Sequence, residues 1–339
     1  MPPEVVRAMA EASRFFIPLP ELEKKVGTRI AELLKAPAAM VTCGAAAAIA
    51  LGTYGCLTGL DTAKVRALPE LTGMRKRAVI LKAHRNGYDH AVRGAGVRLV
   101  EVEGREELAK ALADDCAVFY YLGGTSHDWE AEPSLPVEEC LAAARRARVP
   151  LLVDAANMLP GWDNVTRLGA MGVDLIALSG GKHIRGPQSS GILAGRRELI
   201  QAATLNSSPY SDSQGRPMKV NREEMVGLWV AVERYAKLDF AALDRESARQ
   251  ADYLIEGFRA LGLRAERTPF DRTRRVHRVR IGWDVGRSAL TAEAVVKKLW
   301  DGEPRISVAV HKGQIEFTCF MNESGEEKVA LRRMREIFG

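Results

Sequence analysis

The stretch that decides the fold is LLVDAANMLPGWDNVTRLGAMGVDLIALSGGKHIRGPQSSG, residues 151–191. It begins with an apolar run that ends in Asp154, a pattern typical of a buried parallel strand that presents one carboxylate at its C-terminal end. A second apolar run, residues 173–178, leads into Ser179, two glycines and Lys182. The pattern predicts two successive strands that deliver a carboxylate and an amine to one edge of a sheet.

A carboxylate and a lysine in this order suit pyridoxal 5′-phosphate chemistry. The lysine forms a Schiff base with the cofactor aldehyde, and the carboxylate keeps the pyridine nitrogen protonated so that the ring accepts electrons. Glycines beside Lys182 let the backbone turn tightly and approach a flat ring. The spacing alone also allows a second interpretation, in which Lys182 is a surface lysine in a glycine loop and Asp154 caps a helix.

Three segments resemble the selenocysteine-synthase-like family of fold-type I pyridoxal-phosphate enzymes, and its ammonia-lyase branch more than its selenium-transferase branch. They are VDAANMLP (153–160), SGGKHIRGPQSSGILAGRRELI (179–200) and GRPMKVNREEMVGLWVAVERY (215–235). The resemblance implies a homodimer or larger homo-oligomer. It also implies a lyase that removes the Cα proton of a 2-amino-3-hydroxy acid or amino sugar acid, eliminates the β-substituent and releases ammonia and a 2-oxo acid.

The chain departs from this family at two places. The family pattern KVGKE reads KVNRE here, so Arg222 offers a fork of donors where a lysine offers a point charge. The chain also starts later than the usual family N-terminus. Racemase or aldolase chemistry on the same carbanion, selenium transfer to seryl-tRNA and a non-enzymatic scaffold remain alternative interpretations.

A phosphate cup is predicted where a short strand, residues 40–43, meets Gly44, Ala45 and Ala46. A glycine turn that enters a helix of small residues exposes unpaired N–H groups at the positive end of the helix dipole. We expect these three residues to bind the cofactor phosphate through the main chain. Good helix packing would explain the same alanines.

The strand predicted at residues 77–82 delivers His84, Arg85 and Tyr88 to the same edge of the sheet. A flat ring here would stack on the pyridine, and a cation would meet a substrate carboxylate or phosphate. We predict a catalytic role for His84, in stacking or proton handling, and substrate contacts for Arg85 and Tyr88. A loop histidine that only makes hydrogen bonds is the alternative.

Two further loops supply polar side chains. Thr125 and Ser126 follow the strand predicted at residues 117–122, and we expect them near the phenolic oxygen of the cofactor, although turn formation also explains them. Ser179, at the end of its strand, is predicted to bind the cofactor. Arg185 and Gln188 follow Lys182 and are predicted to contact substrate or the cofactor of a neighbouring subunit.

Alternation of strands and helices predicts an α/β fold with a doubly wound, mostly parallel sheet whose ligands bind at the C-terminal ends of the strands. We expect an N-terminal arm that contacts a neighbouring subunit (1–28), a large cofactor-binding domain (29–240) and a small C-terminal α+β domain (241–339). Arg278 and Arg305 in the small domain are candidates for binding a substrate carboxylate, and the sequence does not choose between them.

Composition bounds the remaining possibilities. The 339 residues include 49 basic and 43 acidic side chains, a net charge of +6 that favours an anionic substrate. Five cysteines without CxxC spacing predict neither a disulfide framework nor a metal site. No signal peptide or long apolar window is present, which predicts a cytoplasmic enzyme. The sequence contains no block of basic residues interleaved with aromatic residues, so nucleic-acid binding is not expected.

Overall fold

The structure is a computed structural model that describes residues 1–124, 134–270, 274–284, 286 and 288–339. Its contacts divide the chain into a first unit that ends at Leu238 and a second unit from Asp239 to Gly339. Each unit has its own sheet and its own apolar core.

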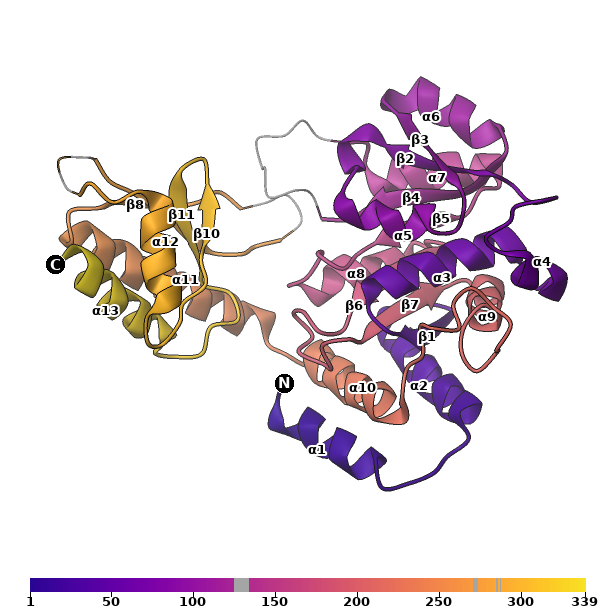
Figure 1. Ribbon diagram of the computed structural model, residues 1–339, viewed down its shortest axis with the longest axis horizontal. Helices are drawn as coiled ribbons and strands as arrows, with labels where there is room; N and C mark the ends of the chain where they lie inside the picture. Colours follow the sequence, from indigo (N-terminus) through magenta and orange to yellow (C-terminus); the bar gives the residue numbers. More distant parts are fainter. Residues whose placement is uncertain (125–133, 271–273, 285, 287) are drawn as a thin grey trace. The chain divides into compact units, whose positions relative to one another are not determined.

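Within the described residues, the first unit contains a seven-stranded sheet with the order β1-β7-β6-β5-β4-β2-β3 (Figure 1). Five strands from β6 to β3 run parallel, and β7 is antiparallel to both β6 and β1. The predicted mostly parallel sheet is confirmed, and the C-terminal ends of every strand except β7 lie at one edge. The strands are β1 (Ala38–Thr42), β2 (Arg77–Leu81), β3 (Arg98–Val102), β4 (Cys116–Leu122), β5 (Leu151–Asp154), β6 (Leu175–Ser179) and β7 (Gly191–Gly195).

Helix α3 (Ala45–Thr58) lies along this sheet and contacts β4, β5, β6 and β7 (Figure 1). Its small residues allow the close approach. A Cβ on Gly52 would lie 2.8 Å from the side chain of Leu152, and one on Gly55 would lie 2.9 Å from the Ala203 nitrogen. Further helices of the unit are α4 (Thr62–Ala67), α5 (His90–Arg93), α6 (Gly104–Ala113), α7 (Val137–Ala147), α8 (Trp162–Ala170) and α9 (Arg197–Leu205).

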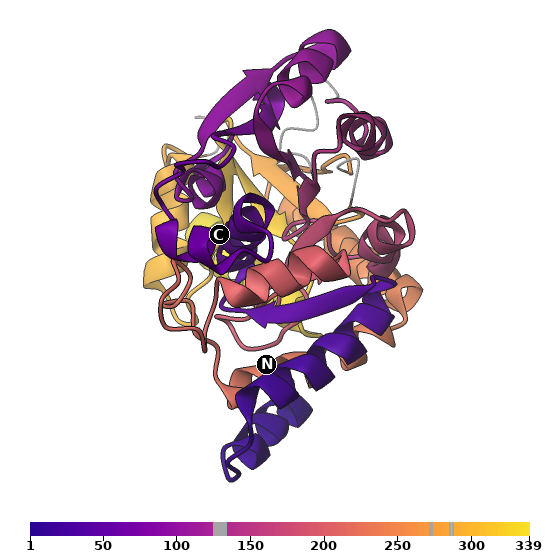
Figure 2. The same cartoon turned by 90° about the vertical axis from the view of Figure 1, so that its right-hand side faces the viewer.

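The predicted N-terminal arm, residues 1–28, contains α1 (Pro3–Ala12) and the first part of α2 (Leu19–Leu34). Both helices lie beside α10 (Arg222–Ala236), as Figures 1 and 2 show. Arg222 binds the end of α1: its Nε donates to Ala12 O at 3.1 Å and its Nη2 to Ser13 O at 2.8 Å. The arginine that replaces the family lysine therefore fastens the arm to its own chain. Contact of the arm with another subunit stays a prediction.

The second unit is α+β. Its described strands form an antiparallel sheet in the order β10-β11-β9-β8, covered by helices that enclose an apolar core around Phe258, Val279 and Ile315. Its elements are α11 (Phe240–Ala260), β8 (Arg264–Arg267), β9 (Arg278–Gly282), α12 (Ala292–Asp301), β10 (Ala309–His311), β11 (Gln314–Thr318) and α13 (Glu326–Phe338). The sequence patterns did not predict α12, nor α4, α5 and α8 in the first unit.

Candidate active site

Asp154 is the last residue of β5, and only 5% of it is exposed. Its Oδ1 accepts a hydrogen bond from the Ala156 N–H at 3.0 Å, and its Oδ2 accepts one from the Tyr120 hydroxyl at 3.0 Å. Burial raises the pKa of the Asp154 carboxyl, while these two hydrogen bonds and the Lys182 charge act in the opposite direction. The carboxylate is thus fixed at the C-terminal edge of the sheet and retains lone pairs for one more donor.

Tyr120 is a site residue that sequence reasoning missed. It lies inside the apolar strand β4, where a buried aromatic side chain reads as ordinary core. The parallel register pairs Leu122 with Asp154 and Tyr120 with Leu152, so Tyr120 and Asp154 project from the same face as diagonal neighbours. No signal within the strand itself could have revealed this contact, because residues 120 and 154 meet only through strand pairing.

Lys182 lies in a tight loop between β6 and β7. Tight packing shapes this lysine loop, residues 180–190: a Cβ on Gly181 would lie 2.4 Å from Gln188 O, and Arg185 N donates to Lys182 O at 3.0 Å. The Lys182 side chain is exposed in the single chain, yet its charge is among the influences that lower the pKa of Asp154. Ser179, half-buried, ends β6 opposite Gly191 of β7.

The predicted phosphate cup lies beside this loop. Gly44 precedes α3 with a positive φ of 96°, and no side chain caps the helix. A Cβ on Gly191, directly after the lysine loop, would lie 2.4 Å from the Gly44 carbonyl carbon. Close packing of two glycines therefore brings the start of α3 next to the lysine loop, and Ala46 is exposed there.

These residues suit pyridoxal 5′-phosphate. The buried Asp154 carboxylate would gain a partner for its negative charge from a protonated ring nitrogen, which would offset the burial that raises its pKa. The uncapped N–H groups at the start of α3 are donors for a phosphate. Lys182 supplies the amine that a cofactor aldehyde requires.

His84 lies in a short 3-10 turn after β2 and is buried. Its Nδ1 accepts the Leu122 N–H at 3.2 Å, so the ring proton is on Nε2, which lies 2.8 Å from Ser134 Oγ. Burial lowers the pKa of His84 to about 4. The ring is therefore neutral near pH 7, which leaves the proposed stacking role open but argues against proton donation by an imidazolium.

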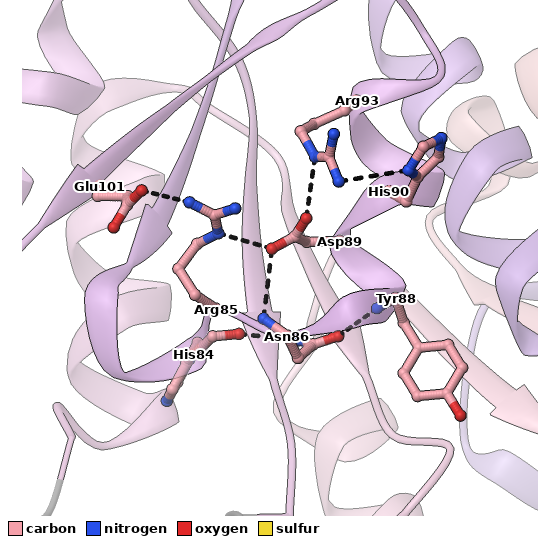
Figure 3. Close-up of polar contacts among 8 residues, drawn as sticks. All are labelled: His84, Arg85, Asn86, Tyr88, Asp89, His90, Arg93 and Glu101. Carbon is pink, nitrogen blue, oxygen red and sulfur yellow. Dashed lines mark hydrogen bonds and ion pairs between the residues drawn. The ribbon is translucent and has the colours of Figure 1, made fainter.

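Arg85 is held away from a free substrate-binding role by two carboxylates. Its Nε donates to Asp89 Oδ2 at 2.6 Å, and its Nη1 bonds to Glu101, as Figure 3 shows. Tyr88, in the same turn, is exposed and its ring points away from this group (Figure 3). The predicted substrate contacts of both residues stay predictions, and Arg85 would have to leave its ion pairs to make one.

The remaining predicted residues fall in three places. Arg185 and exposed Gln188 belong to the lysine loop, where both stay candidates for substrate contact. Thr125 and Ser126 lie outside the described residues. In the second unit, Arg278 pairs with Glu316 at 3.4 Å, and the Arg305 guanidinium lies over the Trp300 ring at 5.6 Å.

A separate cavity of about 740 Å³ lies between α2, β1 and α9. Its lining includes Glu23, whose pKa is raised to about 7 by burial, together with Arg197 and Tyr210. None of the site residues predicted from the sequence lines this cavity.

Comparison with known proteins places the chain in a family. The aminotransferase class-V family matches residues 102–297, more than half of the chain. The chain is 29% identical to a 5′-C-glycyluridine monooxygenase-decarboxylase of Streptomyces, over 98% of this chain and 84% of that protein. It is also 29% identical to a D-glucosaminate-6-phosphate ammonia lyase of Salmonella typhimurium, over 99% of this chain and 90% of that protein.

Solved structures agree with this placement. A D-glucosaminate-6-phosphate ammonia-lyase superposes with a TM-score of 0.82 at 28% identity, over 99% of this chain and 91% of that chain. A serine palmitoyltransferase solved with pyridoxal phosphate shares the fold alone, with a TM-score of 0.63 at 16% identity over 98% of this chain and 83% of that one. The chain therefore belongs to the aminotransferase class-V family, and it has the fold-type I architecture whose cofactor is pyridoxal 5′-phosphate.

Proposed function

We propose that this chain is a pyridoxal-phosphate-dependent ammonia-lyase that acts on a 2-amino-3-hydroxy acid or an amino sugar acid, as D-glucosaminate-6-phosphate ammonia-lyase does by its name. The observation that carries the proposal is the buried Asp154 carboxylate at the sheet edge, whose pKa the Lys182 charge acts to lower. The chain that contains this pair matches the lyase over nearly its whole length.

When bound, pyridoxal phosphate joins the substrate amine to a ring that accepts electrons from the adjacent carbon. Asp154 would hold the proton on the ring nitrogen, because its carboxylate is fixed by Ala156 and Tyr120. Gly44, Ala45 and Ala46 would hold the phosphate through their N–H groups, with Ser179 and Thr125 as further contacts.

Lys182 would act as the general base. Its amine takes the proton from Cα, and the hydroxyl then leaves from Cβ with one proton, as water. Lys182 is also the better donor of that proton, because the low pKa of His84 keeps the histidine neutral. Water finally replaces the nitrogen, so the products are ammonia and a 2-oxo acid. Arg185 and Gln188, in the lysine loop, are the proposed substrate contacts.

A second candidate function comes from the other full-length relative. The chain matches a monooxygenase-decarboxylase at the same 29% identity. That chemistry would consume oxygen and release carbon dioxide. Oxygen uptake therefore separates the two candidates, and product analysis separates both from racemase, aldolase or selenium-transfer chemistry.

The test uses purified protein loaded with pyridoxal phosphate. We expect a visible absorption band that Lys182→Ala abolishes and that Lys110→Ala, at an exposed lysine of α6, retains. Amino sugar acids and 2-amino-3-hydroxy acids, with and without phosphate, are then assayed for ammonia and 2-oxo acid. A wild-type protein without the band would refute cofactor binding at Lys182. A band without ammonia release from any of these substrates would refute the lyase.

We also propose that the enzyme is cytoplasmic and works as a homodimer or larger homo-oligomer. No described helix has both the length and the apolar character needed to cross a bilayer. Sedimentation of the holoenzyme measures the assembly, and a monomer at micromolar concentration would contradict this part of the proposal.

A further inference from the structure

We propose that Tyr120 is a positioning residue that keeps Asp154 ionised and oriented toward the cofactor. The proposal rests on the proposed function, since Asp154 acts through a ring nitrogen. It concerns the hydrogen bond that joins β4 to the end of β5.

The Tyr120 hydroxyl is a donor to Asp154. Tyr120 is fully buried, and its oxygen lies 3.0 Å from Asp154 Oδ2. An ionised carboxylate only accepts hydrogen bonds, so the proton lies on the tyrosine. Burial, followed by the charge of Asp154, raises the pKa of Tyr120, which keeps the phenol protonated and able to donate.

The titratable groups that act on this hydrogen bond are Lys182, on Asp154, and Asp89, on Tyr120. His84, in the turn after β2, stays neutral.

The matched control is Tyr121, the next residue of β4. Its hydroxyl donates a hydrogen bond to Leu135 O at 3.0 Å, and among the described residues it makes no bond to Asp154. Tyr121→Phe removes this hydroxyl and keeps the ring that packs edge-on against His84 at 4.4 Å. Tyr120→Phe and Tyr121→Phe therefore each remove one tyrosine hydroxyl, and only Tyr120→Phe removes a hydrogen bond to the Asp154 carboxylate.

The first measurement is a pH titration of the visible band of the protein loaded with pyridoxal phosphate. Loss of a hydrogen-bond donor disfavours the charged form of the Asp154 carboxylate. Tyr120→Phe should therefore raise the pKa of the acid-side transition of the visible band by about one unit, a tenfold change in proton affinity. Tyr121→Phe should titrate like wild type. An unmoved pKa in Tyr120→Phe overturns the proposal.

The second measurement uses the protein without cofactor. A double-mutant cycle in urea unfolding combines Tyr120→Phe with Asp154→Ala, and a control cycle combines Tyr121→Phe with Asp154→Ala. We expect the first cycle to show a coupling of about tenfold in the unfolding constant and the second less than about twofold. Equal coupling in the two cycles overturns the proposal. Failure of wild type to bind the cofactor would instead end the proposed function, and the first cycle would still show whether the bond exists.

Discussion

Asp89 offers the sharpest test of how the turn after β2 is held. Only 1% of its side chain is exposed, and it accepts hydrogen bonds from Arg85 Nε at 2.6 Å and Arg93 Nε at 3.0 Å (Figure 3). We predict that Asp89→Asn is strongly destabilising. The amide keeps the shape of the carboxylate but loses its charge, and its NH₂ group must face an arginine donor.

The magnitude follows from these two bonds. A hydrogen bond to a charged group contributes about 1.5–3 kcal/mol, and breaking one partner of a buried pair costs about 3–5 kcal/mol. Both arginines are more than a third exposed, so solvent screening reduces the total. We expect the free energy of unfolding to fall by about 2–4 kcal/mol.

Urea unfolding of the cofactor-free protein near pH 7 measures this loss. The control is Glu106→Gln in α6, which breaks an exposed pair with Lys110 and should cost less than about 0.5 kcal/mol. Burial raises the pKa of Asp89, but the bonds from Arg85 and Arg93 lower it by more. Its contribution is thus present above about pH 4 and is lost as the pH falls further. An Asp89→Asn variant as stable as Glu106→Gln would refute the reasoning.

Two other predictions concern glutamate and glycine positions. Burial raises the pKa of Glu23 to about 7, so the fold loses stability as the pH rises from about 4.5 to 7. Glu23→Gln should remove this pH dependence and be more stable than wild type by about 1–3 kcal/mol at about pH 8. An equal pH dependence of the free energy of urea unfolding in the two proteins would contradict this. Gly191→Ala places a Cβ against Gly44 and should lower the free energy of unfolding by about 1–3 kcal/mol and weaken pyridoxal-phosphate binding, measured by absorbance. Gly286→Ala, whose Cβ would lie in open space, should change neither. Tight cofactor binding by Gly191→Ala would contradict the proposed phosphate cup.

The sequence by itself determined most of the fold. Apolar runs that end in polar residues predicted β5 and β6, and a glycine followed by alanines predicted the start of α3. Both predictions use residue patterns within the element itself, which do not depend on distant parts of the chain. It also placed Asp154 and Lys182 at strand ends. Since parallel strands share an edge for their C-terminal ends, that position alone predicted a common site.

Only the tertiary structure decided how the side chains meet. The antiparallel direction of β7 brings Gly191 against Gly44, and no residue in either segment encodes that pairing locally. The contact of Tyr120 with Asp154 depends on strand register, a long-range property set by the packing of the whole sheet. Burial, which is also a property of the assembled fold, keeps His84 neutral.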